Sequence, residues 1–292
     1  MRKFPQFCLW LFISSLIAAP SSLLSKDSYW STIKFEVSTA LSLEKSLLDT
    51  SYFSQFSPPF QPGPYLSKAE QKIYLQGKES VGFNVAFAYF PYEKLGFQFQ
   101  LEYGKPKISG KNTPYNVSLE YTLNLPPNLQ PQLFTYERTY AWPDTEGHLD
   151  QLCLSLNAVA RLPVAKNLAI NVSGGLSYFY IGGQAGSLGY SNFRLEGLSL
   201  HSETYEVEYK LGTLQKLGLN LGAEFAWIIY GNLCFVTDLR FYGCPKTTAS
   251  LELKSAGLIS DPIDKVEAMM NLGDITINPS FYRINFGLKY LF

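Results

Sequence analysis

The densest cluster of titratable side chains in this sequence is the run Asp144-Thr-Glu-Gly-His-Leu-Asp150, which brings Glu146 and His148 together with two aspartates. A histidine beside carboxylates is the arrangement that activates a nucleophile in hydrolysis, and the same groups suit a divalent cation. The run matches no catalytic motif, and the other histidine, His201, lies near Glu203. We therefore expect no catalytic residues and interpret the run as a solvated strand end, with hydrolysis as the weaker alternative.

No other motif points to a bound cofactor. The sequence has no glycine-rich phosphate loop between a strand and a helix, and no nucleophile elbow, because Gly174-Gly175 lies within a strand pattern. Cys153, Cys234 and Cys244 lack the spacing of a metal site, and three cysteines do not make a disulfide framework. We expect no cofactor and no metal, and whether these cysteines pair stays open.

A second set of charges occurs singly, on the polar faces of segments whose other face is apolar. If those segments close around an interior, six cations and four anions face into it, namely Lys34, Glu36, Glu102, Arg161, Lys216, Glu224, Asp238, Arg240, Arg283 and Lys289. Charges in a narrow interior must pair or be hydrated, because an isolated buried charge is very costly. We favour an interior filled by ion pairs. A narrow water-filled pore with a slight anion preference is the alternative.

The composition limits the class of protein. The 292 residues include 24 basic and 24 acidic side chains, and 46% are hydrophobic and 15% aromatic. Such a chain is too hydrophobic for intrinsic disorder, and it has no basic excess for binding nucleic acid. Only 16% of the residues are charged, against about a quarter in soluble proteins. The aromatic residues therefore need a surface other than an ordinary soluble core.

Alternation of apolar and polar residues with period two is the dominant pattern, and it is typical of strands with one apolar face. In Leu95–Tyr103 every odd position is apolar. Such segments are longer than the usual strand of about five or six residues, and they match the roughly nine to eleven residues of a tilted membrane strand. Aromatic residues gather near the strand ends, as in an aromatic girdle. One rim is predicted at Tyr89, Trp227, Tyr230, Tyr290 and Phe292, and the other at Tyr103, Tyr180, Phe241 and Tyr282.

The connections alternate strictly between short and long. Tight turns are predicted at Pro91–Lys94, Pro163–Asn167 and Tyr230–Asn232, and long links at Glu44–Ser80, Gly104–Asp150, Gly182–Leu214 and Gly243–Ser280. A transmembrane barrel has this alternation, with short periplasmic turns and long extracellular loops. We predict an all-β fold, an antiparallel up-and-down transmembrane β-barrel of eight strands. Lipid offers no water to an open edge, so the barrel must close.

Ten strands are the alternative, because one long link contains a further alternating pair of segments. Tyr115–Leu125 and Gln132–Trp142 form either a hairpin above the membrane or two more spanning strands. Tyr205, Val207, Tyr209 and Leu211 continue the phase of the strand that follows them, which predicts strands that extend well beyond the lipid. A short helix is expected across Ile263–Leu272.

The first 25 residues are interpreted as a cleaved signal peptide. Arg2 and Lys3 precede the apolar run Phe7–Ala19, which is too short to span a bilayer as a helix. Residues 26–292 then form the barrel domain, exported from the cytoplasm.

The C-terminal stretch resembles the β-signal of bacterial outer-membrane proteins. It has a final aromatic residue and apolar residues at alternate positions before it, namely Tyr282, Ile284, Phe286, Leu288, Tyr290 and Phe292. With the signal peptide and the alternating link lengths, the chain looks like a barrel of the OmpA/OmpX/opacity-protein type. The resemblance implies location in the bacterial outer membrane, contact with its lipid and lipopolysaccharide, and insertion by the barrel assembly machinery.

Three functions follow from this interpretation. We favour a non-enzymatic structural or surface-interaction barrel, whose long loops bind a host or surface ligand. A small porin-like channel for small solutes is the alternative. An outer-membrane enzyme acting on lipid A or peptide is the third, and the Asp144–Asp150 run is its only candidate site, or else a site for a divalent cation shared with lipopolysaccharide.

Overall fold

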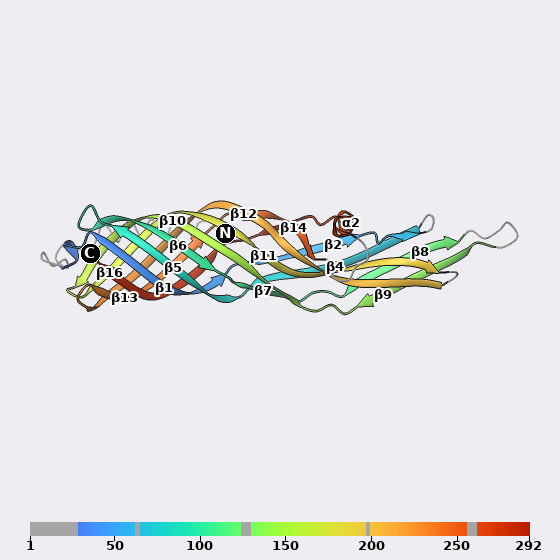
Figure 1. The fold of residues 1–292 in the computed structure, drawn as a ribbon, viewed down its shortest axis with the longest axis horizontal. Coiled ribbons are helices and arrows are strands. Elements are labelled where there is room, and N and C mark those ends of the chain that lie inside the picture. The colour runs from blue at the N-terminus through green and yellow to red at the C-terminus, as the bar shows by residue number, and fades with distance from the viewer. Residues whose placement is uncertain (1–28, 62–64, 124–129, 197–198, 256–261) are drawn as a thin grey trace, which may run out of the picture.

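The computed structural model describes residues 29–61, 65–123, 130–196, 199–255 and 262–292. Eight strands form a closed ring in which each strand pairs antiparallel with its neighbours and the last pairs with the first (Figure 1). The ring strands, in order, are β1 (Phe35–Ser46), β5 (Glu79–Tyr89), β6 (Leu95–Gly104), β10 (Thr145–Ala165), β11 (Leu168–Glu196), β12 (Ser199–Tyr230), β13 (Leu233–Gly243) and β16 (Phe281–Leu291). The predicted eight-stranded up-and-down barrel is therefore confirmed.

The outer face of the ring is an apolar belt. Leu41, Phe87 and Leu219 have exposed fractions of 65%, 50% and 63%. The residues of both predicted rims are exposed, and so are all six residues of the C-terminal β-signal pattern on β16 and just after it. Water does not tolerate a continuous belt of this kind, whereas lipid does. The ring is therefore the transmembrane part of the molecule. No helix among the described residues is long and apolar enough to cross a membrane.

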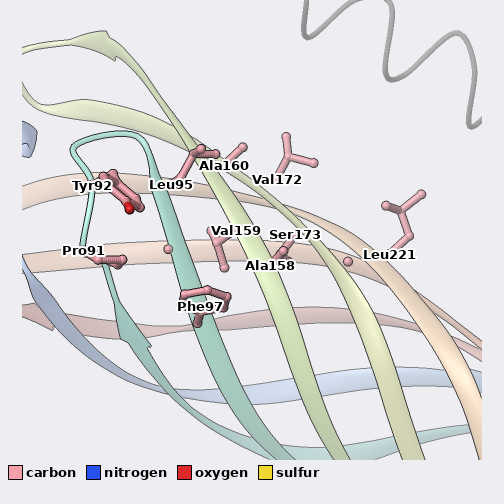
Figure 2. A pocket seen from close by; sticks show the side chains of 12 residues that line it. Pro91, Tyr92, Leu95, Phe97, Ala158, Val159, Ala160, Val172, Ser173 and Leu221 are labelled. Atoms are coloured by element: carbon pink, nitrogen blue, oxygen red, sulfur yellow. The ribbon is translucent and has the colours of Figure 1, made fainter.

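A shallow groove interrupts the belt near the end of the barrel that carries the tight turns. Figure 2 shows Tyr92, Leu95 and Phe97 on one side of it and Val172 and Leu221 on the other. Small side chains on β10 leave a volume of about 410 Å³ between them. The groove lies on the lipid-facing surface, so we interpret it as filled by acyl chains.

The long links are built mainly from strands that extend the molecule beyond one end of the ring (Figure 1). β10, β11 and β12 continue past the belt, and the added strands are β2 (Asp49–Phe56), β3 (Phe60–Gln61), β4 (Tyr65–Gly77), β7 (Lys107–Gly110), β8 (Tyr115–Leu123), β9 (Gln132–Tyr140), β14 (Thr247–Ser255) and β15 (Asp274–Ile277). β8 pairs with β9 and with β4, and none of the three pairs with a ring strand within the belt. The two segments that allowed a ten-stranded barrel as the alternative therefore form a hairpin of this extension.

Apolar side chains change sides between the belt and the extension. On β12, Leu219 is 63% exposed whereas Val207 is fully buried, although both positions are odd. The ladder between β11 and β12 shifts register twice, between Ile181 and Gly183 and between Gln184 and Gly186. The first shift adds a residue to β12 and the second adds one to β11. Beyond its extra residue, each strand points its side chains to the opposite face. Gly186 has a φ of 125°, a conformation that suits glycine.

One expectation, about the direction in which side chains of β12 point, was therefore wrong. Strands do continue beyond the belt, as the alternation at Tyr205–Leu211 predicted, but Val207, Tyr209 and Leu211 point inward instead of sharing the outward face of the following segment. The inward residues of the extension form its own hydrophobic core, which includes Ile73, Val117 and Tyr190.

The remaining elements complete this arrangement. The expected helix is α2 (Ile263–Met270), which buries Val266 and Met270 in the core of the extension. A 3-10 turn, η2 (Tyr29–Ser31), buries Trp30 at the other end of the barrel. Cys153, Cys234 and Cys244 are buried and free. The predicted signal peptide lies outside the described residues.

Candidate functional site: a closed, ion-paired lumen

The inner face of the ring carries most of the buried charge of the molecule. Period two turns alternate residues of each ring strand inward, and on this face the residues are small, polar or charged. Four cations and five carboxylates are buried among the described residues, namely Arg161, Arg240, Arg283, Lys289, Glu36, Glu44, Glu102, Glu224 and Asp238. They form three groups at successive heights.

The first group lies near the tight turns. Lys289 Nζ is 2.8 Å from Glu36 Oε2 and also binds Glu224. Arg161 pairs with the other oxygen of Glu36. These four side chains come from β1, β10, β12 and β16, so their ion pairs join opposite walls of the ring.

The turn η2 closes this end of the lumen. Arg161 Nη1 donates to the Trp30 carbonyl at 2.9 Å. The Arg161 Cζ atom also lies 3.5 Å from the centre of the Phe90 ring, which is fully buried. The guanidinium is thus held by a carboxylate, a carbonyl and an aromatic face, each a favourable partner for it.

The second group centres on Arg240. Its Nε atom is 3.2 Å from Asp238 Oδ2, and its Nη1 donates to Asn220 at 2.7 Å. Asn285 donates to the same aspartate at 2.9 Å. Gly222 makes room for this guanidinium, because a Cβ atom there would lie 2.9 Å from Arg240 Nε.

The third group lies next to the extension. Arg283 Nη1 is 2.9 Å from Glu102 Oε2, and Nη2 pairs with Glu44. Asn84 donates to Glu102 at 2.7 Å. Glu44 was missed from the sequence because it was assigned to the long link Glu44–Ser80. The period-two series of Glu36, Ser38, Ala40 and Ser42 leads directly to it, and β1 in fact runs to Ser46.

Aromatic rings cover the third group. Tyr242 and Phe281 stack with centroids 4.6 Å apart, and Phe179 meets Phe281 edge to face at 6.1 Å. All three rings are essentially buried. Above them begins the hydrophobic core of the extension. The lumen is therefore filled by ion pairs and then covered by rings, which is the packing expected for a narrow barrel with side chains inside.

Eight of the ten side chains that the sequence assigned to the interior are buried in these groups, and two are not. Lys34 precedes β1, and its side chain is exposed. Lys216 lies in the stretch of β12 between its pairing with β13, which ends at Leu219, and its pairing with β14, which begins at Leu211. No described strand pairs with that edge of β12 there, and the Lys216 side chain is exposed.

The Asp144–Asp150 run is only partly brought together. Glu146, His148 and Asp150 share the outer face of β10, and His148 Nε2 is 3.6 Å from Asp150 Oδ2. Asp144 precedes the strand. His201 lies 3.8 Å from Glu196 instead of meeting Glu203. Across the described parts of the chain, no three His, Cys, Asp or Glu side chains are grouped so that they could hold a metal ion.

Comparisons with known proteins do not assign the chain to a family. No protein-family model matches the chain, and no curated protein sequence matches it. Among solved structures, the outer membrane protein OprG from Pseudomonas aeruginosa is similar at 12% identity and a TM-score of 0.41, covering 88% of this chain and 96% of its own. A major outer membrane protein from Thermus thermophilus has 12% identity and a TM-score of 0.43, with 88% and 99% covered.

A third similar structure is Ail, the attachment invasion locus protein of Yersinia pestis, at 10% identity and a TM-score of 0.32, with 89% and 100% covered. These likenesses are too distant to carry a role over to this chain. The barrel assignment rests on the closed strand ring and its apolar belt.

Proposed function

We propose that this protein is a closed barrel of the bacterial outer membrane with a structural or surface-interaction role. The signal peptide, residues 1–25, directs export, and residues 26–292 insert as the barrel. The β-signal pattern from Tyr282 to Phe292 is recognised by the assembly machinery, and lipid and lipopolysaccharide surround the apolar belt. The main support for the proposal is the filled lumen, which argues against a channel. We therefore assign the function to the extension, the strands beyond the end of the ring.

The extension suits a surface that binds a partner. Its hydrophobic core fixes its strands, so that the outward side chains are presented on a rigid support. The β8–β9 hairpin is one such support, and β9 is an edge strand that pairs with β8 alone among the described strands. Its exposed residues include Glu137, Arg138 and Thr139. We assign the binding of a host or surface ligand to this part of the molecule.

Epitope labelling on intact cells tests the placement. One variant carries a short epitope between β9 and β10, after Trp142, and its matched control carries the same epitope in the β5–β6 turn, after Tyr92. We expect antibody to label intact cells only with the first variant, and both variants after the outer membrane is permeabilised. Recovery of the protein as a soluble periplasmic chain, or labelling of the turn variant on intact cells, would contradict the proposal.

A further inference from the structure

A row of polar side chains crosses neighbouring strands just beyond the belt. The backbone N–H of Lys78 donates to the Lys107 carbonyl at 2.8 Å, and Lys107 pairs in register with His148. The row continues through Gln184 to Lys210. Residues paired in this way project to the same face of a sheet, and the three lysines of this row are exposed.

The row lies at the depth of the lipid headgroups. Lys107 follows the rim residue Tyr103 by four positions, and Gln184 follows the rim residue Tyr180 by the same number. At about 3.3 Å per residue along a tilted strand, the row is roughly 10 Å beyond the aromatic girdle. Phosphate groups of the surrounding lipid lie in this layer.

Part of the row lines a surface depression of about 610 Å³, to which Lys78, Lys105, Lys107, Ser109, Glu146 and His148 contribute. Asp150 already contacts Lys105 and His148, since its carboxylate is 3.6 Å from both Lys105 Nζ and His148 Nε2. Within the described residues, neither Lys78 nor Lys107 has a carboxylate within ion-pair distance. With Lys105 paired to Asp150, these two lysines outweigh the one carboxylate of the lining, Glu146, so the depression has a net positive charge.

Two lysines facing each other across adjacent strands repel, and an anion held between them would remove that repulsion. The lysines on the other side of His148 differ in this respect. Lys210 is 3.0 Å from Glu252, and Lys254 is 3.4 Å from Glu208. The unpaired charge is thus confined to the Lys78–Lys107 side of the row.

We infer that this depression binds a phosphate group of a lipid headgroup in the adjacent leaflet, through the ammonium groups of Lys78 and Lys107 with Lys105 beside them. Ammonium groups bind phosphate through charge-assisted hydrogen bonds, and the Ser109 hydroxyl supplies a further donor. The inference rests on the proposed function, because it places this part of the extension in the headgroup layer of the outer leaflet.

Lipid retention by the folded full-length chain tests the inference. The chain in non-ionic detergent is mixed with diphosphoryl lipid A, and the lipid that remains bound is measured by native mass spectrometry. We expect the double variant Lys78→Gln/Lys107→Gln to bind about tenfold more weakly. The matched control Lys210→Gln/Lys254→Gln, which removes ion-paired lysines of the same surface, is expected to change binding less than about twofold. Equal binding by the Lys78/Lys107 variant would overturn the inference.

Two further arms identify the ligand and guard against misfolding. Lipid A without phosphates should not be retained, and inorganic phosphate alone should not compete at about millimolar concentration; the opposite results would overturn the lipid phosphate assignment. If the glutamine variant does not fold, the wild-type chain is measured alone. The amount of lipid A that it retains must then fall as the salt concentration rises from about 0.05 M to about 0.5 M. Retention that does not depend on salt would overturn the inference. If the chain reaches the cell surface but retains lipid A equally well with and without phosphates, only this site is contradicted. If the chain is instead recovered from the periplasm, the proposed function is contradicted.

Discussion

Arg283 and Glu102 are joined across the lumen, with 2.9 Å between Nη1 and Oε2, although 181 positions separate them in the sequence. Their strands, β16 and β6, are three steps apart around the eight-stranded ring, so the ion pair acts as a strut between nearly opposite walls. Both side chains are buried, so the loss of either partner would leave a buried charge without its counter-charge, which is costly.

Replacing Arg283 with methionine is predicted to destabilise the barrel by about 3–5 kcal/mol, because Glu102 and Glu44 are left buried without their cation. The measurement is urea unfolding in lipid vesicles, followed by tryptophan fluorescence. Replacing the two carboxylates with leucine in the same variant should recover most of the loss, since no buried charge at this level then lacks a partner.

The control for this prediction is Lys45→Met, which removes a pair on the surface. Lys45 Nζ is 4.0 Å from Glu79, and the two side chains are 66% and 82% exposed. We expect a change below about 1 kcal/mol. If Arg283→Met and Lys45→Met had equal effects on stability, the stabilising role of the Arg283–Glu102 ion pair across the lumen would be contradicted.

Gly222→Ala is predicted to destabilise the barrel by about 1–3 kcal/mol, as overpacking does. The new Cβ would lie 2.9 Å from Arg240 Nε, and this guanidinium has little freedom to move because Asp238, Asn220 and Ser173 hold it. Gly182→Ala is the matched control, because its Cβ would meet only the Thr213 hydroxyl, at 3.7 Å. The unfolding midpoints in urea compare the two, and equal midpoints would count against the packed second group.

The extension is predicted to lose stability in alkali. Burial raises the pKa of Tyr209 well above its ordinary value of 10.0, and burial does the same for Tyr115. The unfolded chain ionises these phenols near pH 10 and the folded chain does not. Their contribution to stability is therefore complete below about pH 10 and is lost progressively as the pH rises above it.

Resistance of the extension to proteolysis between pH 9 and pH 11.5 measures this effect. We expect Tyr209→Phe to weaken the alkaline loss, because the phenol that cannot ionise in the folded state is gone. Tyr230→Phe is the control, since Tyr230 is 84% exposed and lies at the turn end. An alkaline loss that is the same in all three proteins would show that the buried tyrosines are not its cause.

Much of the ring could be predicted from the sequence because lipid on one side and a packed lumen on the other give a clean period of two. This pattern placed β16, the inward position of Arg283 and the belt position of Tyr290. The same pattern did not separate the β8–β9 hairpin from two more spanning strands. A strand with one side in a protein core and one side in water alternates in the same way as a strand in lipid.

The residues that sequence reasoning misplaced lie where local geometry departs from a uniform ladder. Val207 points inward because β12 has an extra residue at the register shift opposite Ile181 and Gly183, which reverses the facing of β12 beyond it. A bulge of this kind has no reliable sequence signal. Lys216 is exposed because β12 changes partner there. Glu44 was missed because its strand was ended too early.

His148→Ala is predicted to leave the chain unchanged in assays of lipid A deacylation and peptide cleavage. His148 is held by Asp150 at 3.6 Å on the outer face of β10, and we assign its neighbourhood to headgroup contact. The purified wild-type chain should release neither fatty acid nor peptide. Turnover by the wild-type chain that His148→Ala abolishes would establish the enzymatic alternative instead.

Single-channel recording in planar lipid bilayers tests the closed lumen most directly. Insertion is verified by heat-modifiable gel mobility of the same preparation, and a porin of known conductance is inserted in parallel as the positive control. We predict no stable conductance step from the folded full-length chain, because three groups of ion pairs and a layer of aromatic rings fill the ring. A reproducible open step would contradict this account and establish the porin-like channel.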